Sequence, residues 1–296
     1  MIHQFAGFED PHEEIRDGSV FGPVARADFL ASYPAGAHLL RHGLRDHPLL
    51  NLDALAQLAS QLENRHVTHH RGDAPEGLCE KPGESGQAIG SVIRSIGKDG
   101  GWASLEQVQR LPGYRELLDE VLKELRPLIQ QRTGKVLRAQ ATIIVLGPGA
   151  SMPNRFAPEH QLLLQVEGQQ VMTIFPRSEV HFGPDGYAAD DDNEHEAELA
   201  WHDSFSRDGM PFSLAPGQAI YLPAREPHMQ SNGETISISL AITWCSEWSA
   251  AEADARSFNG LLRKWGRKPQ PPQRWPGRNY GKALAWRILK RIPWLH

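Results

Sequence analysis

The chain has little cysteine and no long apolar run. Only two of its 296 residues are cysteine, Cys79 and Cys245, too few for a disulfide framework or a four-thiolate zinc site. Its apolar runs, such as residues 143–146, are far shorter than the roughly 20 residues that cross a bilayer. Early acidic residues, Glu9 and Asp10 among them, exclude a basic, apolar secretion signal. We expect a soluble, reduced, cytoplasmic protein.

Acidic residues are missing from the C-terminal stretch. Residues 255–296 hold eleven Lys or Arg and no Asp or Glu. The rest of the chain holds 20 basic and 36 acidic residues. This acidic body argues against nucleic-acid binding, so we expect no nucleic-acid partner. The positive charge of this stretch is complementary to the acidic body of its own chain, to an anionic partner and to a membrane surface.

Glycine and proline are plentiful, with 27 and 22 residues, which disfavours long helical bundles and favours a turn-rich β architecture. Residues 1–110 read as helical and irregular, with a helix capped by Asn51. A second helix is predicted after Pro112 and ends at Gly134. The stretch from Thr68 to Gly101 reads as a loop.

The hydrophobic period then changes to that of strands. Short β-type runs cover residues 137–146, 162–166, 171–175, 219–222 and 235–244. Helices are predicted to follow, one opened by a capping box over 249–252 and one over 280–292. We expect an α+β protein with a mainly β core that closes on itself. Its parts are an N-terminal helical and loop region (1–135), a β-barrel (136–245) and a basic helical region (246–296).

Two segments of the β region carry a recognisable pattern. Residues 153–171 read PNRFAPEHQLLLQVEGQQV, and residues 217–228 read GQAIYLPAREPH. They resemble the cupin-like, JmjC-type branch of the Fe(II)/2-oxoglutarate oxygenases, with the patterns P-F-H-F-D-P-E-H-N-x-L-L-Q-x-x-G-x-K and G-D-x-x-Y-x-P-x-x-x-x-H. The resemblance covers nearly the whole chain. It implies a double-stranded β-helix (cupin or jelly-roll barrel) flanked by N- and C-terminal helices.

The resemblance also implies positions for the iron ligands. Non-haem iron takes two His and one carboxylate on one face, leaving positions for 2-oxoglutarate and dioxygen. A His-x-Asp pair on a strand supplies two of these ligands, because alternate side chains share a face. Here Arg155 and Ala157 occupy those positions, and Met152 stands at the threonine position. Gln170 replaces the lysine that pairs with 2-oxoglutarate, and His228 alone keeps a ligand position.

These replacements argue against iron chemistry. A guanidinium repels a dication, and a single imidazole holds Fe(II) weakly. Loss of the lysine removes a charge-assisted bond worth about 1.5–3 kcal/mol. We therefore expect no metal and no cofactor, and lean towards a non-catalytic or repurposed protein. It would bind a small anion or a protein partner in the old active-site cavity, through Arg155, Gln165, Gln170 and His228.

The alternative is a divergent Fe(II)/2-oxoglutarate-dependent hydroxylase that uses His228 with non-standard ligands. One substitute is His160, although strand parity places it on the face opposite position 155. Others are carboxylates of the acidic insertion over 178–212, which otherwise reads as a solvated loop. Arg155 has two interpretations, an anion-binding group or a structural cation paired with Glu159 or Glu226.

Two histidine groups lack the spacing of metal ligands and are predicted to lie at the surface. They are His66, His69 and His70, and the pair His42 and His47.

The basic C-terminal helices indicate an interaction surface. Apolar residues alternate there with Lys and Arg, as at an interface with a basic rim. Relatives in the wider JmjC-type hydroxylase family form dimers through C-terminal helices, so the resemblance implies a homodimer. Contact with a membrane surface and packing on the chain's own barrel are the alternatives.

Overall fold

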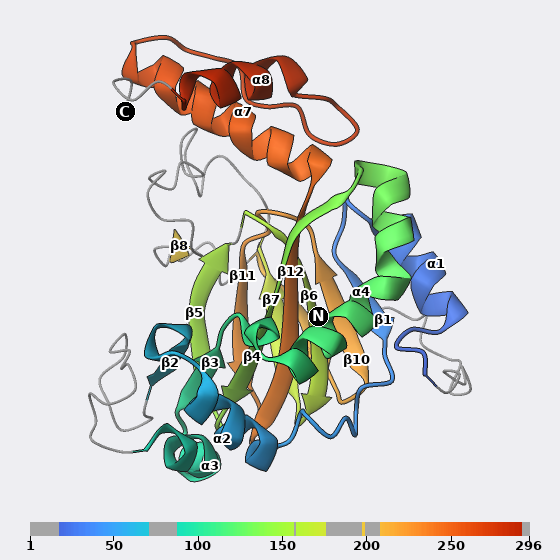
Figure 1. Cartoon of the computed structure of the whole chain (residues 1–296), viewed down its shortest axis with the longest axis vertical. Helices are drawn as coiled ribbons and strands as arrows, with labels where there is room; N and C mark the ends of the chain where they lie inside the picture. Colours follow the sequence, from blue (N-terminus) through green and yellow to red (C-terminus); the bar gives the residue numbers. More distant parts are fainter. Residues whose placement is uncertain (1–17, 71–87, 157, 176–196, 199–207, 292–296) are drawn as a thin grey trace.

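Two antiparallel sheets form the centre of the molecule (Figure 1). The computed structural model describes residues 18–70, 88–156, 158–175, 197–198 and 208–291. The larger sheet has seven strands, and the long β12 lies at its middle, paired with β6 and β4. Its strand order is β1 (His38–Arg41), β10 (Gln218–Leu222), β6 (His160–Glu167), β12 (Ser237–Ser246), β4 (Val136–Leu146), β3 (Trp102–Leu105) and β2 (Val67–His70).

The smaller sheet packs on one face of the larger sheet. Its order is β8 (Ala197–Glu198), β5 (Ser151–Phe156), β11 (His228–Asn232), β7 (Gln170–Ile174) and β9 (Met210–Leu214). A cluster of buried apolar residues joins the two sheets. It includes Met152, Met172 and Leu214 of the smaller sheet with Ile144, Leu163 and Ile220 of the larger one. The inward positions of the strands follow from this cluster and the alternation of side chains.

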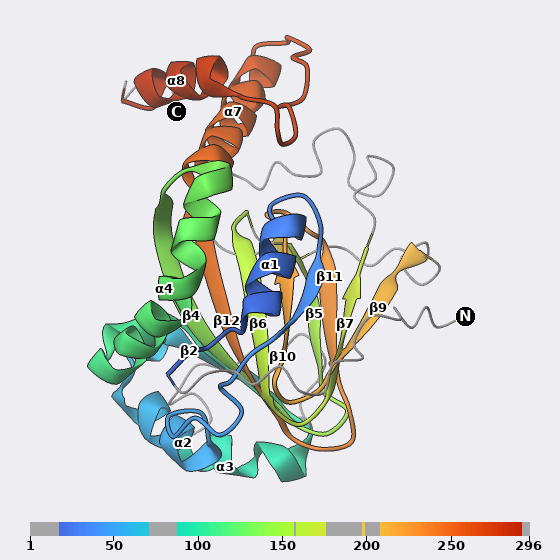
Figure 2. The same ribbon diagram turned by 90° about the vertical axis from the view of Figure 1, so that its right-hand side faces the viewer.

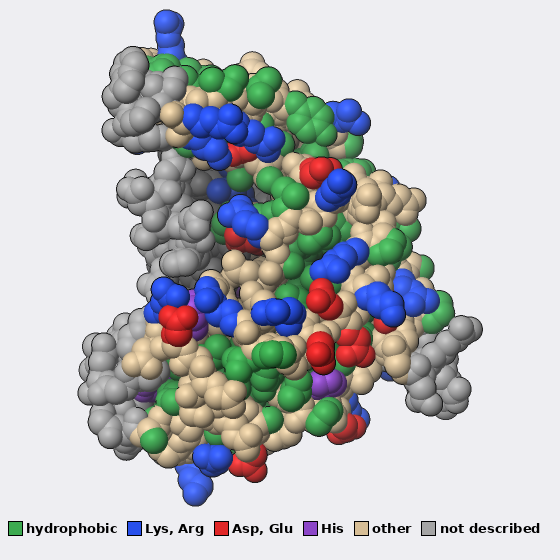
Figure 3. Space-filling model, viewed as in Figure 1, with side chains coloured by type: hydrophobic (Ala, Val, Ile, Leu, Met, Phe, Trp, Pro, Cys, Tyr) green, Lys and Arg blue, Asp and Glu red, His purple; other side chains and the backbone are tan. Residues whose placement is uncertain are grey.

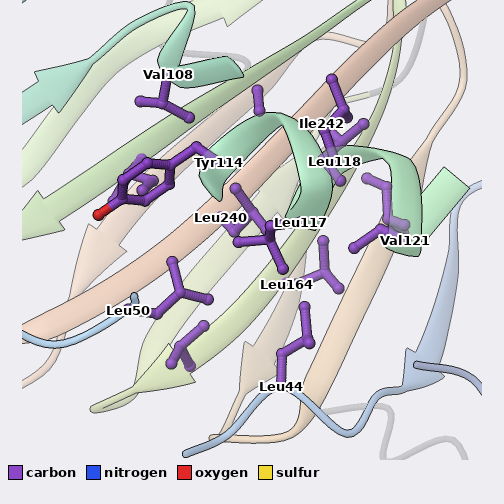
Figure 4. Packing of buried hydrophobic residues seen from close by; sticks show 14 of the residues in the cluster. Leu44, Leu50, Val108, Tyr114, Leu117, Leu118, Val121, Leu164, Leu240 and Ile242 are labelled. Atoms are coloured by element: carbon purple, nitrogen blue, oxygen red, sulfur yellow. The ribbon is translucent and has the colours of Figure 1, made fainter. Parts of the chain in front are cut away.

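Four helices lie on the larger sheet's other side (Figure 2). They are α1 (Pro23–Ser32), α2 (Leu52–Gln61), α3 (Ile89–Asp99) and α4 (Pro112–Thr133), with single 3₁₀ turns at Asn64–His66 and Val108–Arg110. Leu117 and Val121 of α4 pack towards Leu164, Leu240 and Ile242 of the sheet (Figure 4). The larger sheet is therefore buried on both faces, which explains the near-continuous apolar run in β6.

Two helix ends agree with the sequence prediction, and the start of one helix differs from it. The Asn51 side chain accepts a hydrogen bond from the Ala54 amide (3.1 Å), and α4 ends at Gly134 with a φ of 83°. Helix α7 (Glu247–Lys264) begins earlier than predicted, because β12 runs directly to Ser246. The Ser246 hydroxyl and the Ser249 amide form the cap at 3.2 Å.

Helices α7 and α8 (Tyr280–Leu289) form a pair beyond the end of the sheets (Figures 1 and 2). Ala283 is buried between them, Arg287 Nε lies 2.6 Å from Asp254 Oδ2, and Trp248 Nε1 donates to the Gly277 carbonyl at 2.7 Å. Lys and Arg side chains gather over this pair in Figure 3. The last helix ends at Leu289, short of the predicted 292.

The turn between β6 and β7 depends on a glycine. Gly168 has a φ of 71°, and a Cβ built there would collide with the Ile236 carbonyl. Any other residue would strain the turn and would also collide with the backbone at Ile236.

The prediction of a β core with helices before and after it is confirmed, and the structure shows that its strands pair antiparallel. The N-terminal region departs from the helical and loop prediction, since β1, β2 and β3 each add four residues to the larger sheet. Helix α3 also lies within the stretch of residues 68–101 that was predicted to be a loop. No helix among the described residues has the length and apolarity that a membrane span requires. The three-part division of the chain stays a prediction.

Candidate functional site

His228 lies at the start of β11, in the middle of the smaller sheet. Its partners across the sheet are Arg155 of β5 and Ile174 of β7. The imidazole is buried, with 4 % of the residue exposed, and its Nδ1 lies 2.8 Å from the Glu226 carbonyl oxygen. Because a carbonyl only accepts, Nδ1 carries a proton, and in the neutral form of the ring the lone pair would be on Nε2. Imidazoles that bind metals are commonly held in this way.

The register of β5 and β11 contains a bulge beside His228. His228 pairs with Arg155 and Gln230 pairs with Met152, so two steps along β11 match three along β5. The extra residue places positions 152 and 155 opposite inward positions of β11. Arg155 is thus paired across the sheet with His228, the one residue that keeps a ligand position in the resemblance.

Several predicted site residues lie outside the described structure. The backbone of Arg155 is described, whereas Ala157 and the acidic residues 190–194 are not. Whether the metal ligands have been lost, and which interpretation of Arg155 holds, therefore stay predictions. Within the described ranges, no three His, Cys, Asp or Glu side chains come together as a metal site.

Gln165 and Gln170, both predicted site residues, are brought together with Ser239 of β12. Gln170 Nε2 donates to Gln165 Oε1 at 2.5 Å and to Ser239 Oγ at 2.9 Å. Ser239 Oγ donates in turn to Gln165 Oε1 at 2.9 Å. All three side chains are at least 98 % buried between the two sheets. We call this group the amide cluster.

Further buried polar side chains lie on the facing sides of the two sheets and were missed by the sequence reasoning. Gln161, Gln230 and Ser237 occupy inward positions on β6, β11 and β12 and are nearly fully buried. The side-chain oxygens of these three residues, and Oε1 of Gln170, have no hydrogen-bond partner. Buried polar atoms are normally paired, so these four oxygens are exceptions among the described residues. The sequence signal that could have identified these residues is the alternation of polar side chains along their strands.

His160 lies on the opposite face of β6, as strand parity predicts. Its Nδ1 is 2.9 Å from the Tyr221 hydroxyl, and its ring stacks with Trp244 at 5.7 Å between centroids. This aromatic group also includes Tyr33 and lies against the helices, away from the space between the sheets. His160 is therefore not placed to bind a metal together with His228.

The surface prediction for the other histidines is wrong in part. His42, His66 and His69 are buried, with exposed fractions of 3 %, 6 % and 1 %. His42 Nε2 donates to the Gln165 carbonyl (3.0 Å), and its Nδ1 accepts from the Leu44 amide (3.2 Å). Burial lowers the pKa of His42 to about 4, so this side chain is a neutral structural element at neutral pH.

Comparison with known proteins identifies the class of fold. No protein-family model and no curated protein sequence matches this chain. Solved structures do match, and they have the fold of the cupin-like 2-oxoglutarate oxygenases.

The particular structures are those of YcfD, a ribosomal oxygenase of Escherichia coli. One gives a TM-score of 0.51 at 17 % identity and covers 90 % of this chain and 67 % of that one. Another, in complex with cobalt and 2-oxoglutarate, gives 0.50 at 14 % identity, with 93 % and 68 % covered. The chain thus spans about two thirds of the length of YcfD. At these identities the likeness shows a shared fold.

The expectation of no cofactor is contradicted by this comparison. The fold that the chain shares is one in which YcfD holds cobalt and 2-oxoglutarate. The expectation came from the replaced side chains at positions 155, 157 and 170, which do not outweigh the shared fold.

Proposed function

We propose that this chain is a divergent member of the 2-oxoglutarate oxygenases, with a double-stranded β-helix as its core. Successive strands from β4 onward support the barrel. Strands β4, β6, β10 and β12 belong to the larger sheet, and β5, β7, β9 and β11 to the smaller one. The chain passes from one sheet to the other at each step except along β7, β8 and β9, which all lie in the smaller sheet, and two facing sheets connected in this way support a jelly roll. Residues 136–245 are the proposed barrel unit, between the N-terminal (1–135) and C-terminal (246–296) regions.

The proposed function is the binding of a 2-oxo acid between the two sheets, beside His228. The observation that carries it is the tautomer of His228, whose Nδ1 is engaged by the Glu226 carbonyl. The fold relationship with YcfD, a protein that binds 2-oxoglutarate, supports the same site. We propose Arg155, Gln165, Gln170 and His228 as the residues that surround the ligand.

The fit of a metal ion is limited by the donor set. Nε2 of His228 suits one ligand position of a divalent ion, but the described residues do not form a three-ligand centre around it. A bound ion would chelate the 2-oxo acid and, as iron, activate dioxygen. We derive no reaction step through it, and the proposal concerns the ligand and the one histidine.

The test is a binding measurement on the full chain. The melting temperature is followed with Mn²⁺ alone, with pyruvate, 2-oxobutyrate or 2-oxoglutarate alone, and with each acid plus Mn²⁺. We expect the largest rise when metal and acid are combined, and its loss in His228→Ala. His38→Ala, a half-buried histidine of β1, is the matched control and should keep the rise.

Two results would change the proposal. A 2-oxo acid that stabilises the chain equally without metal would favour a repurposed anion-binding protein. No stabilisation by any acid, with or without Mn²⁺, would refute binding of this class of ligand.

A further inference from the structure

We infer that the C-terminal helix pair, residues 247–291 with α7, α8 and the segment between them, binds the surface of an anionic lipid bilayer. The pair lies at one end of the molecule, and both apolar and basic side chains are visible on its surface (Figures 1 and 3). The inference is independent of the proposed function, because no residue proposed for that site belongs to the pair.

Exposed apolar side chains are concentrated in this pair. Seven large apolar side chains are exposed in the described structure, and the pair holds four of them: Trp265, Tyr280, Leu284 and Ile288. The last three, 56–61 % exposed, are four residues apart on α8. They therefore form one apolar stripe, about 12 Å long, on one side of the helix. Contiguous exposed apolar side chains mark interaction surfaces.

The same pair carries a strong positive charge. It holds eleven Lys or Arg and only three Asp or Glu. Two of the acidic residues, Glu252 and Asp254, already form ion pairs with arginines of the same helices at 2.6 Å. The surplus of eight positive charges favours a partner with a negative surface.

Basic residues stand at both ends of the apolar stripe. The guanidinium carbon of Arg278 lies 5.8 Å from the centroid of the Tyr280 ring, and the exposed Arg291 follows Ile288 by three residues. A bilayer matches this arrangement, because its acyl boundary accepts apolar side chains and its anionic headgroups attract the cations around them. The end of α7 and the segment after it add four more exposed cations: Lys264, Arg267, Lys268 and Arg274.

The segment between the two helices is held in place before any partner binds. The Asn279 side chain accepts from the Gln273 amide and donates to the Gln273 carbonyl, each at 2.9 Å. Lys282 Nζ and Asn259 Nδ2 both donate to the Gln270 carbonyl, at 2.6 and 2.9 Å. Because these bonds already order the segment, little conformational freedom is lost when the surface binds.

The charge favours a bilayer over a second copy of the chain. In a symmetric dimer the same patch faces itself, so this surface would bring two large positive charges together. A nucleic acid would match the charge but offers no apolar medium for the stripe. An anionic bilayer matches both features, and Tyr and Trp prefer its interface. With ten residues, α8 is too short to cross a bilayer and would lie on it.

The test measures binding of the full chain to vesicles by sedimentation. One set of vesicles contains phosphatidylcholine alone, and the other contains phosphatidylcholine and phosphatidylglycerol in equal amounts. We expect binding to the anionic vesicles to be tighter by about tenfold or more, and to weaken as added salt screens the charges. Equal binding to the two sets, or no binding to the anionic vesicles, overturns the inference.

One pair of variants tests the apolar stripe. Leu284→Ser with Ile288→Ser removes apolar area without changing the charge, and should weaken binding to the anionic vesicles by about tenfold or more. Val24→Ser, at a valine of α1 that is 58 % exposed, is the control and should leave binding unchanged. The same affinity in both variants would overturn the role of the stripe and with it the inference.

A second pair of variants tests the cations. Arg267→Glu with Lys268→Glu should abolish binding to the anionic vesicles. Lys98→Glu with Lys123→Glu, at exposed positions of α3 and α4, changes the net charge of the chain by the same amount and should retain most of the binding. Equal losses in the two double variants would overturn the inference, because the attraction would then depend on net charge and not on this surface.

A second copy of the chain on the stripe is the competing occupant. Light scattering without vesicles measures the mass of the unmodified chain and of Leu284→Ser with Ile288→Ser. The same mass for both supports the inference. A dimer that the two substitutions convert to monomers would place a second copy on the stripe and overturn it.

Discussion

The two faces of the larger sheet differ in what they bury. On the helix side, β6 and β12 present Leu164, Leu240 and Ile242 to a continuous apolar core. On the other side the same strands present Gln165 and Ser239 together with unpaired oxygens. This second side also contributes Leu163 and Ala241 to the apolar cluster between the sheets. We call it the polar face because it combines apolar packing with buried polar groups, and we call the helix side the apolar face. Four predictions test this division, from the largest expected effect on stability to the smallest.

The apolar face should be the most sensitive to truncation. Leu164 is fully buried in the core under α4, so Leu164→Ala should lower the free energy of unfolding by about 2–5 kcal/mol. Urea unfolding measures the change. Leu284→Ala, at a leucine that is 61 % exposed, is the control and should have little effect. Equal losses in the two variants would contradict the assignment of the core.

His42 connects the N-terminal segment to the backbone of β6 and makes the fold sensitive to acid. Its pKa is lowered from 6.5 to about 4 by burial, so the unfolded chain binds this proton first as the pH falls. Stability is thus lost between about pH 6.5 and 4. From pH 7.5 to 4.5 this group should lower the free energy of unfolding by about 2–3 kcal/mol.

Urea titrations at the two pH values measure this loss, and His42→Gln should reduce it. The same loss in the variant as in the unmodified chain would show that His42 is not the group responsible.

On the polar face, the loss of stability should be larger when a paired glutamine is replaced than when an unpaired one is replaced. Gln165→Leu removes the acceptor of Gln170 and Ser239, which should cost about 1–3 kcal/mol for each buried group left without a partner. Gln161→Leu removes an oxygen that has no partner and should be close to neutral. Thermal unfolding of both variants checks the prediction. A larger loss in Gln161→Leu would show that its oxygen is paired in solution.

The C-terminal helix pair lies outside both faces and should affect assembly without affecting stability. Tyr280, Leu284 and Ile288 of α8 are 56–61 % exposed at one-turn spacing, so they share one side of the helix. If the predicted homodimer forms through this stripe, Leu284→Glu with Ile288→Glu should convert dimers to monomers at an unchanged melting temperature. Light scattering gives the mass. A monomeric unmodified chain would refute the dimer.

The sequence predicted the elements whose signal is local. Helix α4 has an apolar face, an opening proline and a closing glycine, and the long strands β4, β6 and β12 are rich in apolar residues. Strands β1, β2 and β3 have four residues each, too few to show a period. The small-sheet strands β5, β9 and β11 were missing from the periodicity analysis because their residues are mixed in character.

The residues proposed for the site stay a prediction, and the hydrogen bonds among them were not foreseen from the sequence. The resemblance identified Gln170 and His228, which lie on neighbouring strands as it implies. The unpaired oxygen of Gln170 depends on the register of β6, β7 and β12 and on two backbone carbonyls. None of these can be read from residue types alone. The burial of His42 was missed for the same reason, because its acceptor belongs to a strand 123 residues away.

The tight turn at Gly168 has a consequence for how the amide cluster could evolve. Its carbonyl is one of the two that orient Gln165, and its backbone is one that only glycine adopts easily. The direction in which the buried Gln165 amide faces is thus inherited from the backbone of a hairpin. A substitution that reshapes this hairpin should therefore rearrange the amide cluster even where every member of the cluster is kept.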